Sequence, residues 1–284
     1  MSDRTVPAGS RILVTGAAGG FGAPTVARLR AQGARVVGLD LRGADVDCDV
    51  TDGEAVDRAV AEAVGSLGGL DALVHYAGIG IPNDAGGPLE PDALKVIDTN
   101  LLGAWRVTAA ALPALTDRDG ARGIDPGRGP DKGRVVFVSS ELAYVTLPFV
   151  SAYSVAKRGM TAYADALRLE FGTALHVTTV YPGYVRTGIH AAGEEVGLSL
   201  EGQVRAEEVD DIVGTVLREL AARRPRRDTA GTRRGQVELW AGRHLPGLVA
   251  RGVSSRMRRQ VARGGFDGST IAKGLVHRLS GGTR

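Results

Sequence analysis

The chain has 284 residues, of which 43% are hydrophobic and 41 are glycine, and its only cysteine is Cys48. One cysteine excludes an intrachain disulfide framework. The sequence also lacks the apolar core of a signal peptide and any apolar run of membrane-spanning length, so we expect a soluble cytoplasmic protein. Residues 1–222 carry 20 Lys/Arg and 29 Asp/Glu, whereas residues 223–284 carry 15 and 3. The basic excess belongs to the tail, which argues against nucleic-acid binding by the main body.

The first predicted unit is a strand, a glycine-rich turn and a helix. An apolar strand over residues 11–15 leads into the glycines between Gly16 and Gly22, and a helix runs from about Phe21 to Gln32. Such a junction presents backbone N–H groups and the positive end of the helix dipole to one place. The turn therefore predicts a binding site for the pyrophosphate of a dinucleotide.

A carboxylate at the end of the second strand indicates which dinucleotide binds. The strand over residues 34–40 ends at Asp40, and an acid about 20 residues past the glycines accepts hydrogen bonds from the adenosine ribose hydroxyls. The same charge repels a 2′-phosphate, so NAD is favoured over NADP. Arg42 could soften this discrimination. The other interpretation, a surface Asp at a strand end, fits the register less well.

Further strands and helices alternate along the chain. We predict strands over 70–75, 134–139 and 175–181, and a last strand over 236–240. Between them we predict a helix that begins with a capping box of Thr51 and Glu54, a helix from Pro91 to about Leu115 with a break near 98–100, a helix over 152–171 and a helix from Glu207 to Leu220. Residues 79–90 are predicted as a loop and residues 116–133 as a polar surface insertion. This order predicts an α/β fold, a single Rossmann-type doubly wound parallel sheet with helices on both faces.

A chemically suggestive pair lies on the helix over 152–171. Tyr153 and Lys157 are four residues apart, which places them one turn apart on one helix face. The ammonium would stabilise a phenolate and lower the pKa of the tyrosine toward neutral pH. Such a tyrosine exchanges a proton with a carbonyl or carbinol oxygen, and the hydroxyl of Ser139 or Ser140 could hold that oxygen. Taken alone, the pair is better explained by an amphipathic helix with a half-buried tyrosine and a solvated lysine.

Together these motifs resemble those of the short-chain dehydrogenase/reductase family, over roughly residues 10–243. Thr15-Gly-Ala-Ala-Gly-Gly-Phe-Gly22 matches TGxxxGxG, Tyr153-Ser-Val-Ala-Lys157 matches YxxxK, and Pro182-Gly-Tyr-Val-Arg-Thr187 matches PGxVxT. Ser140 precedes Tyr153 by 13 residues, which is the family spacing and selects it over Ser139. One departure is His75-Tyr-Ala-Gly78, where the family has NNAG, so the asparagine that normally ties neighbouring strands is replaced.

The resemblance implies both a catalytic set and a cofactor site, with no metal. The catalytic residues would be Asn100, Ser140, Tyr153 and Lys157. The cofactor would contact Thr15, Gly16, Gly20, Phe21, Gly22, Asp40, Asp49, Val50, Ala77, Gly78, Asn100, Tyr153, Lys157, Pro182, Gly183, Val185 and Thr187.

The resemblance also implies a reaction, hydride transfer between NAD(H) and a secondary alcohol or ketone. Tyr153 would be the general acid/base, Lys157 would bind the nicotinamide ribose, and Asn100 would hold a water that links Lys157 to solvent. Two alternatives stay open: an epimerase or lyase that uses the nicotinamide transiently, and a non-catalytic cofactor-binding regulator.

The substrate is indicated only by its expected pocket, which residues 141–150 and 184–204 would form and to which the tail, packed over the cleft, could contribute. Apolar side chains at Leu142, Tyr144, Val145, Leu147 and Phe149 predict a pocket for a hydrophobic, steroid-like or polyketide-like small molecule. A histidine in the same region, His190, is expected to be a solvated loop residue rather than a substrate contact.

The domain organisation is predicted as a dehydrogenase domain over 1–243, with the insertion at 116–133, followed by a basic amphipathic extension over 244–284. In the extension, apolar residues recur at three- and four-residue steps among arginines, which is typical of a helix packed on an acidic body or, less favoured, on a membrane surface.

Pairing through helices near 100–115 and 152–171 predicts a homodimer or homotetramer, with Ala109, Ala110, Ala162 and Ala164 allowing close packing.

Overall fold

The computed structural model describes residues 5–116, 132–198, 206–266, 268–269 and 271–280. Most of the predicted insertion at 116–133 lies outside the described residues. Seven strands form one parallel sheet in the order β3-β2-β1-β4-β5-β6-β7. They are β1 (Arg11–Thr15), β2 (Arg35–Asp40), β3 (Val46–Asp47), β4 (Ala72–His75), β5 (Gly133–Val138), β6 (Leu175–Val180) and β7 (Asp228–Thr229). The prediction of a doubly wound parallel sheet is confirmed.

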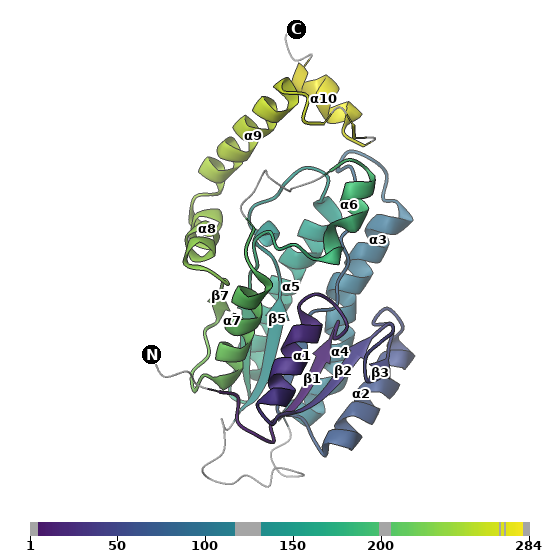
Figure 1. Cartoon of the computed structure of the whole chain (residues 1–284), viewed down its shortest axis with the longest axis vertical. Coiled ribbons are helices and arrows are strands. Elements are labelled where there is room, and N and C mark those ends of the chain that lie inside the picture. Colours follow the sequence, from purple (N-terminus) through teal and green to yellow (C-terminus); the bar gives the residue numbers. More distant parts are fainter. Residues whose placement is uncertain (1–4, 117–131, 199–205, 267, 270, 281–284) are drawn as a thin grey trace.

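Helices cover both faces of this sheet, because alternate strand residues point to opposite sides. On one face lie α2 (Gly53–Leu67), α4 (Ala104–Thr116) and α5 (Ser151–Phe171), packed on strand residues such as Leu73 and Phe137. On the other face lie α1 (Gly22–Ala31) and α7 (Val209–Ala221), packed on residues such as Val74 and Val136. Two buried cores therefore hold the sheet rigid, and its strand ends can position a site (Figure 1).

The long helix predicted after Pro91 is interrupted, as expected. It consists of α3 (Pro91–Ile97), a wide π-type turn over Asp98–Gly103, and α4. A π-turn inserts extra backbone into a helix and recurs at functional sites. Here it turns the side chain of Asn100 inward, where that residue is fully buried.

Two local predictions are wrong. Residues 236–240 form part of a helix, α8 (Arg233–His244), and the last strand is β7. The hydroxyl of Thr232 caps α8 by accepting the Gly235 N–H at 3.0 Å, which favours a helix start. Before α2, Asp52 rather than Thr51 is the N-cap, and its carboxylate accepts the Ala55 N–H.

The helices of the tail form an arch, a name that we use for α8 and the two helices that follow it. From α8 the chain continues as α9 (Pro246–Ala262) and α10 (Lys273–Ser280), beyond the end of the molecule where α3 and α6 (Ala191–Glu195) lie (Figure 1). The helices predicted for the tail are confirmed. Among the described residues, no helix combines the length and apolarity that crossing a membrane requires.

Candidate active site

Tyr153 and Lys157 lie one turn apart on α5, at the end of the neighbouring strand β5. The Lys157 side chain is buried, and its Nζ atom lies 5.6 Å from the centre of the Tyr153 ring. The same ammonium donates a hydrogen bond to the Val138 carbonyl at 2.9 Å. An ammonium has three donors, so Lys157 is fixed at the strand end with further donors available for a ligand.

The structure does not give Tyr153 the lowered pKa that the spacing predicts. Burial raises the pKa of Tyr153 to about 12, although a hydrogen bond with Ser140 acts in the opposite direction. Burial also lowers the pKa of Lys157 to about 8. Desolvation disfavours both charged forms, and it outweighs the attraction on which the prediction relied.

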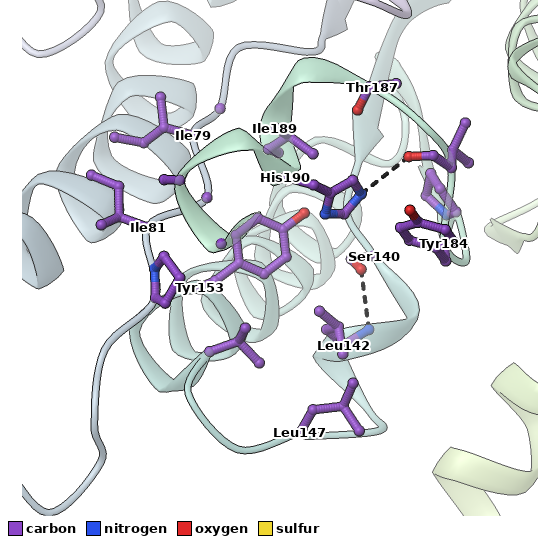
Figure 2. Close-up of a pocket in the computed structure, with 18 of the residues that line it drawn as sticks. Ile79, Ile81, Ser140, Leu142, Leu147, Tyr153, Tyr184, Thr187, Ile189 and His190 are labelled. Atoms are coloured by element: carbon purple, nitrogen blue, oxygen red, sulfur yellow. Dashed lines mark hydrogen bonds between the residues drawn. The ribbon is translucent and has the colours of Figure 1, made fainter. Parts of the chain in front are cut away.

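The two serines after β5 have different surroundings. Ser139 donates its hydroxyl to the Lys157 carbonyl at 3.1 Å, so it connects the strand to α5. Ser140 accepts the Leu142 N–H at 3.1 Å, and its hydroxyl acts against the rise of the Tyr153 pKa. Figure 2 shows Ser140 and Tyr153 on the wall of one pocket. The family spacing therefore selected the serine that shares the pocket wall with the tyrosine.

Asn100 holds the loop that follows β4. Its Oδ1 accepts the Ile79 N–H at 2.7 Å, and its Nδ2 donates to the Ile79 carbonyl at 2.8 Å. A Cβ atom on Gly78 would lie 3.0 Å from Asn100 Oδ1 and 3.7 Å from Lys157 Nζ. Asn100 and Lys157 thus flank the same glycine, where a side chain would crowd both.

The glycine-rich turn has the shape that a pyrophosphate needs. Gly16 adopts a φ of +66°, and a Cβ there would lie 2.6 Å from the Ala77 nitrogen. A Cβ on Gly20 would lie 2.9 Å from Thr187 Cγ2, so this turn and the loop after β6 close on each other. These contacts require glycine for packing, and the same turn also lines the large cavity with Gly16, Gly19, Gly20 and Gly22. The residues present therefore fit a dinucleotide, because a wall without side chains lets its phosphates approach the backbone N–H groups.

Asp40 is oriented toward the same turn. Its carboxylate accepts the Ala18 N–H at 2.9 Å and the Leu41 N–H at 2.8 Å. Each carboxylate oxygen has a second lone pair, so the group can still accept ribose hydroxyls. Asp49 accepts both the N–H and the hydroxyl of Thr51, at 2.9 and 2.7 Å.

One large cavity joins these groups. Its volume is about 1860 Å³, and its wall includes all the predicted cofactor-binding residues except Thr15, Asn100 and Lys157, which are buried behind it. Beside Tyr153 the wall is apolar, formed by Ile79 and Ile81 on one side and by Leu142 and Leu147 on the other (Figure 2).

Two predictions about the substrate region are wrong. Tyr144 does not line the cavity, since its ring is stacked between the guanidinium groups of Arg158 and Arg243, at 4.5 and 4.6 Å. His190 is no solvated loop residue. It is half-buried on the cavity wall, its Nε2 lies 3.1 Å from the Val185 carbonyl oxygen, and burial lowers its pKa.

Further wall residues come from segments that were expected at the pocket, Glu141 directly after Ser140 and, in the tail, a stripe of α9 that includes Arg256 and Met257. Arg234 and Glu238 of α8 also line the wall and were not predicted individually. The helical periodicity of the tail is a signal for α9 itself.

Comparisons with known proteins agree with this geometry. The family described as "short chain dehydrogenase" matches residues 10–195. The chain is 26% identical over 282 residues to "Dehydrogenase/reductase SDR family member 7B" of Danio rerio, covering 89% of this chain and 87% of that protein. It is 29% identical over 197 residues to an "Uncharacterized oxidoreductase" of Myxococcus xanthus, covering 63% of this chain and 73% of that protein.

Solved structures share the fold. A short-chain dehydrogenase from Burkholderia cenocepacia, solved in complex with NADP, has a TM-score of 0.70 at 23% identity, over 86% of this chain and 97% of that one. The aldohexose dehydrogenase of Thermoplasma acidophilum has a TM-score of 0.66 at 22% identity, over 78% and 93%. With the family match across more than half of its length, this chain belongs to the short-chain dehydrogenase/reductase family of oxidoreductases.

Proposed function

We propose that the protein is an NAD-dependent oxidoreductase for a hydrophobic secondary alcohol or ketone, with Tyr153 as general acid/base. One observation carries the proposal. Tyr153 and Ser140 lie on the wall of one pocket, where the glycine turn meets an apolar chamber. A carbinol oxygen held there by Ser140 would lose its proton to the Tyr153 phenolate during oxidation and regain it during reduction.

The cofactor accounts for the pKa that the protein alone does not provide. Bound NAD would supply the hydride acceptor for the carbinol C–H bond and the positive charge of its oxidised ring. The buried ammonium of Lys157, one turn from Tyr153, would offer its remaining donors to the ribose hydroxyls. Both charges favour the phenolate, so we propose that the pKa of Tyr153 falls only when the cofactor is bound.

The test is Tyr153→Phe, which removes one hydroxyl and leaves the ring. Because general acid–base catalysis contributes roughly 100- to 10,000-fold, we expect turnover to fall by that factor while NADH still binds, measured by fluorescence titration. Tyr144→Phe, outside the cavity wall, is the control and should stay active. The assay is a steady change of NADH absorbance with secondary alcohols or ketones, which an epimerase would not give. A Tyr153→Phe enzyme with wild-type turnover would overturn the assignment.

The preference for NAD over NADP is a separate prediction. Asp40 would lie against a 2′-phosphate, and like charges about 4 Å apart near a protein surface repel by about 4 kcal/mol. We therefore expect kcat/KM to be at least about tenfold higher with NAD than with NADP. Asp40→Ser should reduce this ratio of the two kcat/KM values. A higher kcat/KM with NADP would mean that Arg42 dominates.

A further inference from the structure

The helix α9 spans the cavity and is anchored by apolar contacts before its start and beyond its end. At its start, α8 is anchored by Leu239, which is buried with Ala143 and Tyr181. Beyond its end, Phe266 and Ala272 are buried around Phe149. Between these anchors no residue of α9 is buried. Met257 and Val261, toward the end of α9, also pack against this second cluster, so the helix is held near its two ends (Figure 1). The cavity extends to α9, and we call the part that α9 borders the space under α9.

The side of α9 that faces this space is part of the same cavity wall as Tyr153. It presents the stripe Val249, Gly252, Val253, Arg256, Met257, Arg259 and Gln260. The cavity volume of about 1860 Å³ exceeds the range of about 300–1,000 Å³ typical of a site for one ligand. A cofactor and a compact ketone would leave the space under α9 empty, whereas an elongated substrate would reach it.

Arg256 gives this space a chemical preference. Arg256 lines the cavity, and its guanidinium forms no hydrogen bond or ion pair with the residues that the structure describes. The carboxylates of the same wall are engaged elsewhere or solvated. Glu238 is paired with Arg234 and Asp98 with Arg106, each at 2.7 Å, Asp40 and Asp49 accept backbone N–H groups, burial raises the pKa of Glu141, and Glu194 and Glu195 on α6 are exposed. A free guanidinium beside apolar side chains suits a carboxylate or phosphate, which its planar fork binds through two hydrogen bonds.

We infer that the space under α9 is a subsite for the far end of an elongated, apolar substrate that carries an anionic group, with Arg256 as the residue that selects it. Val253 and Met257 would contact the apolar chain, and the reacting carbon would lie at Tyr153. The inference rests on the proposed function and narrows its substrate class to anionic amphiphiles.

The turnover test compares linear methyl ketones that end in a carboxylate with their methyl esters, over a series of increasing chain length. We expect wild-type kcat/KM to favour the acid once the chain is long enough to reach Arg256. Arg256→Gln should lower kcat/KM for that acid by roughly three- to tenfold and leave the ester unchanged. Arg256→Lys should retain part of the preference. The matched control is Arg258→Gln, which removes the same charge from an exposed site of the same helix outside the cavity wall.

A binding measurement separates this inference from the proposed function. Calorimetric titration of a long-chain saturated carboxylate and its methyl ester, in the presence of NADH, needs no turnover. Tighter binding of the carboxylate that is lost in Arg256→Gln and kept in Arg258→Gln supports the subsite, even if no ketone is reduced. Equal binding of acid and ester, or equal losses in both variants, overturns it. Reduction of the esters with no acid preference would leave the dehydrogenase intact and reject the subsite alone.

Discussion

Glu141 is the titratable residue closest in sequence to the proposed catalytic serine. Its pKa is raised to about 8, chiefly by burial and in addition by the charges of Glu238 and Glu207. Because the pKa is higher in the folded than in the unfolded chain, Glu141 contributes stability at low pH, where it is protonated. That contribution is lost as the pH rises from about 4.5 through about 8.

This sign gives a prediction for Glu141→Gln, which stays neutral at every pH. We expect the free energy of unfolding of the variant, relative to wild type, to increase by more than about 1 kcal/mol between about pH 5 and pH 8. Denaturant unfolding at a series of pH values measures it. Glu195→Gln, at an exposed position of α6, is the control and should show no such trend. A constant difference for Glu141→Gln would contradict the raised pKa.

Some side chains could be placed in the site from the sequence and others could not. The two groups differ in whether local spacing or a contact with a distant segment fixes where the side chain points. Tyr153 and Lys157 are related by helix geometry, and Ser140 by a short spacing, so a motif is enough to place them together. Tyr144 turns away from the cavity because Arg243, 99 residues later, binds its hydroxyl at 3.1 Å. A contact between segments so far apart in the chain cannot be inferred from the local sequence pattern.

Among the elements, α4 and α5 present an uncovered face. Trp105 on α4 is 50% exposed although it stacks on Tyr163 of α5 at 4.2 Å, and Leu169 on α5 is 87% exposed. Exposed aromatic and apolar side chains on one face are typical of an interface. Ala164, predicted to allow close pairing, is completely buried in the core and cannot take part. We propose that this face joins two copies of the chain.

For the pairing, Trp105→Glu is the decisive variant. A central tryptophan at an interface contributes about 2 kcal/mol or more, so we expect the variant to dissociate to monomers at micromolar concentrations where wild type is dimeric or tetrameric. Light scattering gives the mass. Leu89→Glu introduces the same charge at an exposed loop leucine and should leave the mass unchanged. A monomeric wild type would exclude the proposal.

The mistaken strand over 236–240 shows why elements are harder to predict near the tail. The sequence Gln-Val-Glu-Leu-Trp alternates as a half-buried strand does. The helix is favoured instead by the cap at Thr232 and the ion pair of Arg234 with Glu238 at 2.7 Å, one turn apart. It also buries Leu239 against Tyr181, which sequence periodicity does not reveal.

At the scale of the whole molecule, the far end of the arch is held on the main body by an apolar cluster around Phe149 and Phe266. Phe266 packs edge-on against Phe149, with ring centres 6.4 Å apart. Phe149 is the one non-glycine residue among those described with a positive φ, 65°, a conformation that the surrounding contacts must maintain. The division of the chain into a domain over 1–243 and an extension stays a proposal, because this contact joins the two.

Phe266→Ala should release the arch and leave the sheet intact. Removing a buried phenylalanine costs about 3–5 kcal/mol, and the loss falls on α9 and α10 alone. We expect faster cleavage by trypsin at the arginines of α9, with the main thermal transition unchanged. Leu248→Ala, at a leucine that is 59% exposed, is the control and should be cleaved at the wild-type rate. Equal cleavage of all three proteins would show that the contact does not hold the arch.

The position of the arch along the chain has a consequence for biosynthesis. All strands of the sheet end by Thr229, whereas α9 begins at Pro246. Domains fold as they emerge from the ribosome, with earlier segments first. The cofactor side of the cavity is therefore complete while α9 is still in the exit tunnel. A nascent chain at that stage could already hold a dinucleotide and the apolar wall beside Tyr153, but it would lack the selection for an anionic substrate that we infer for Arg256.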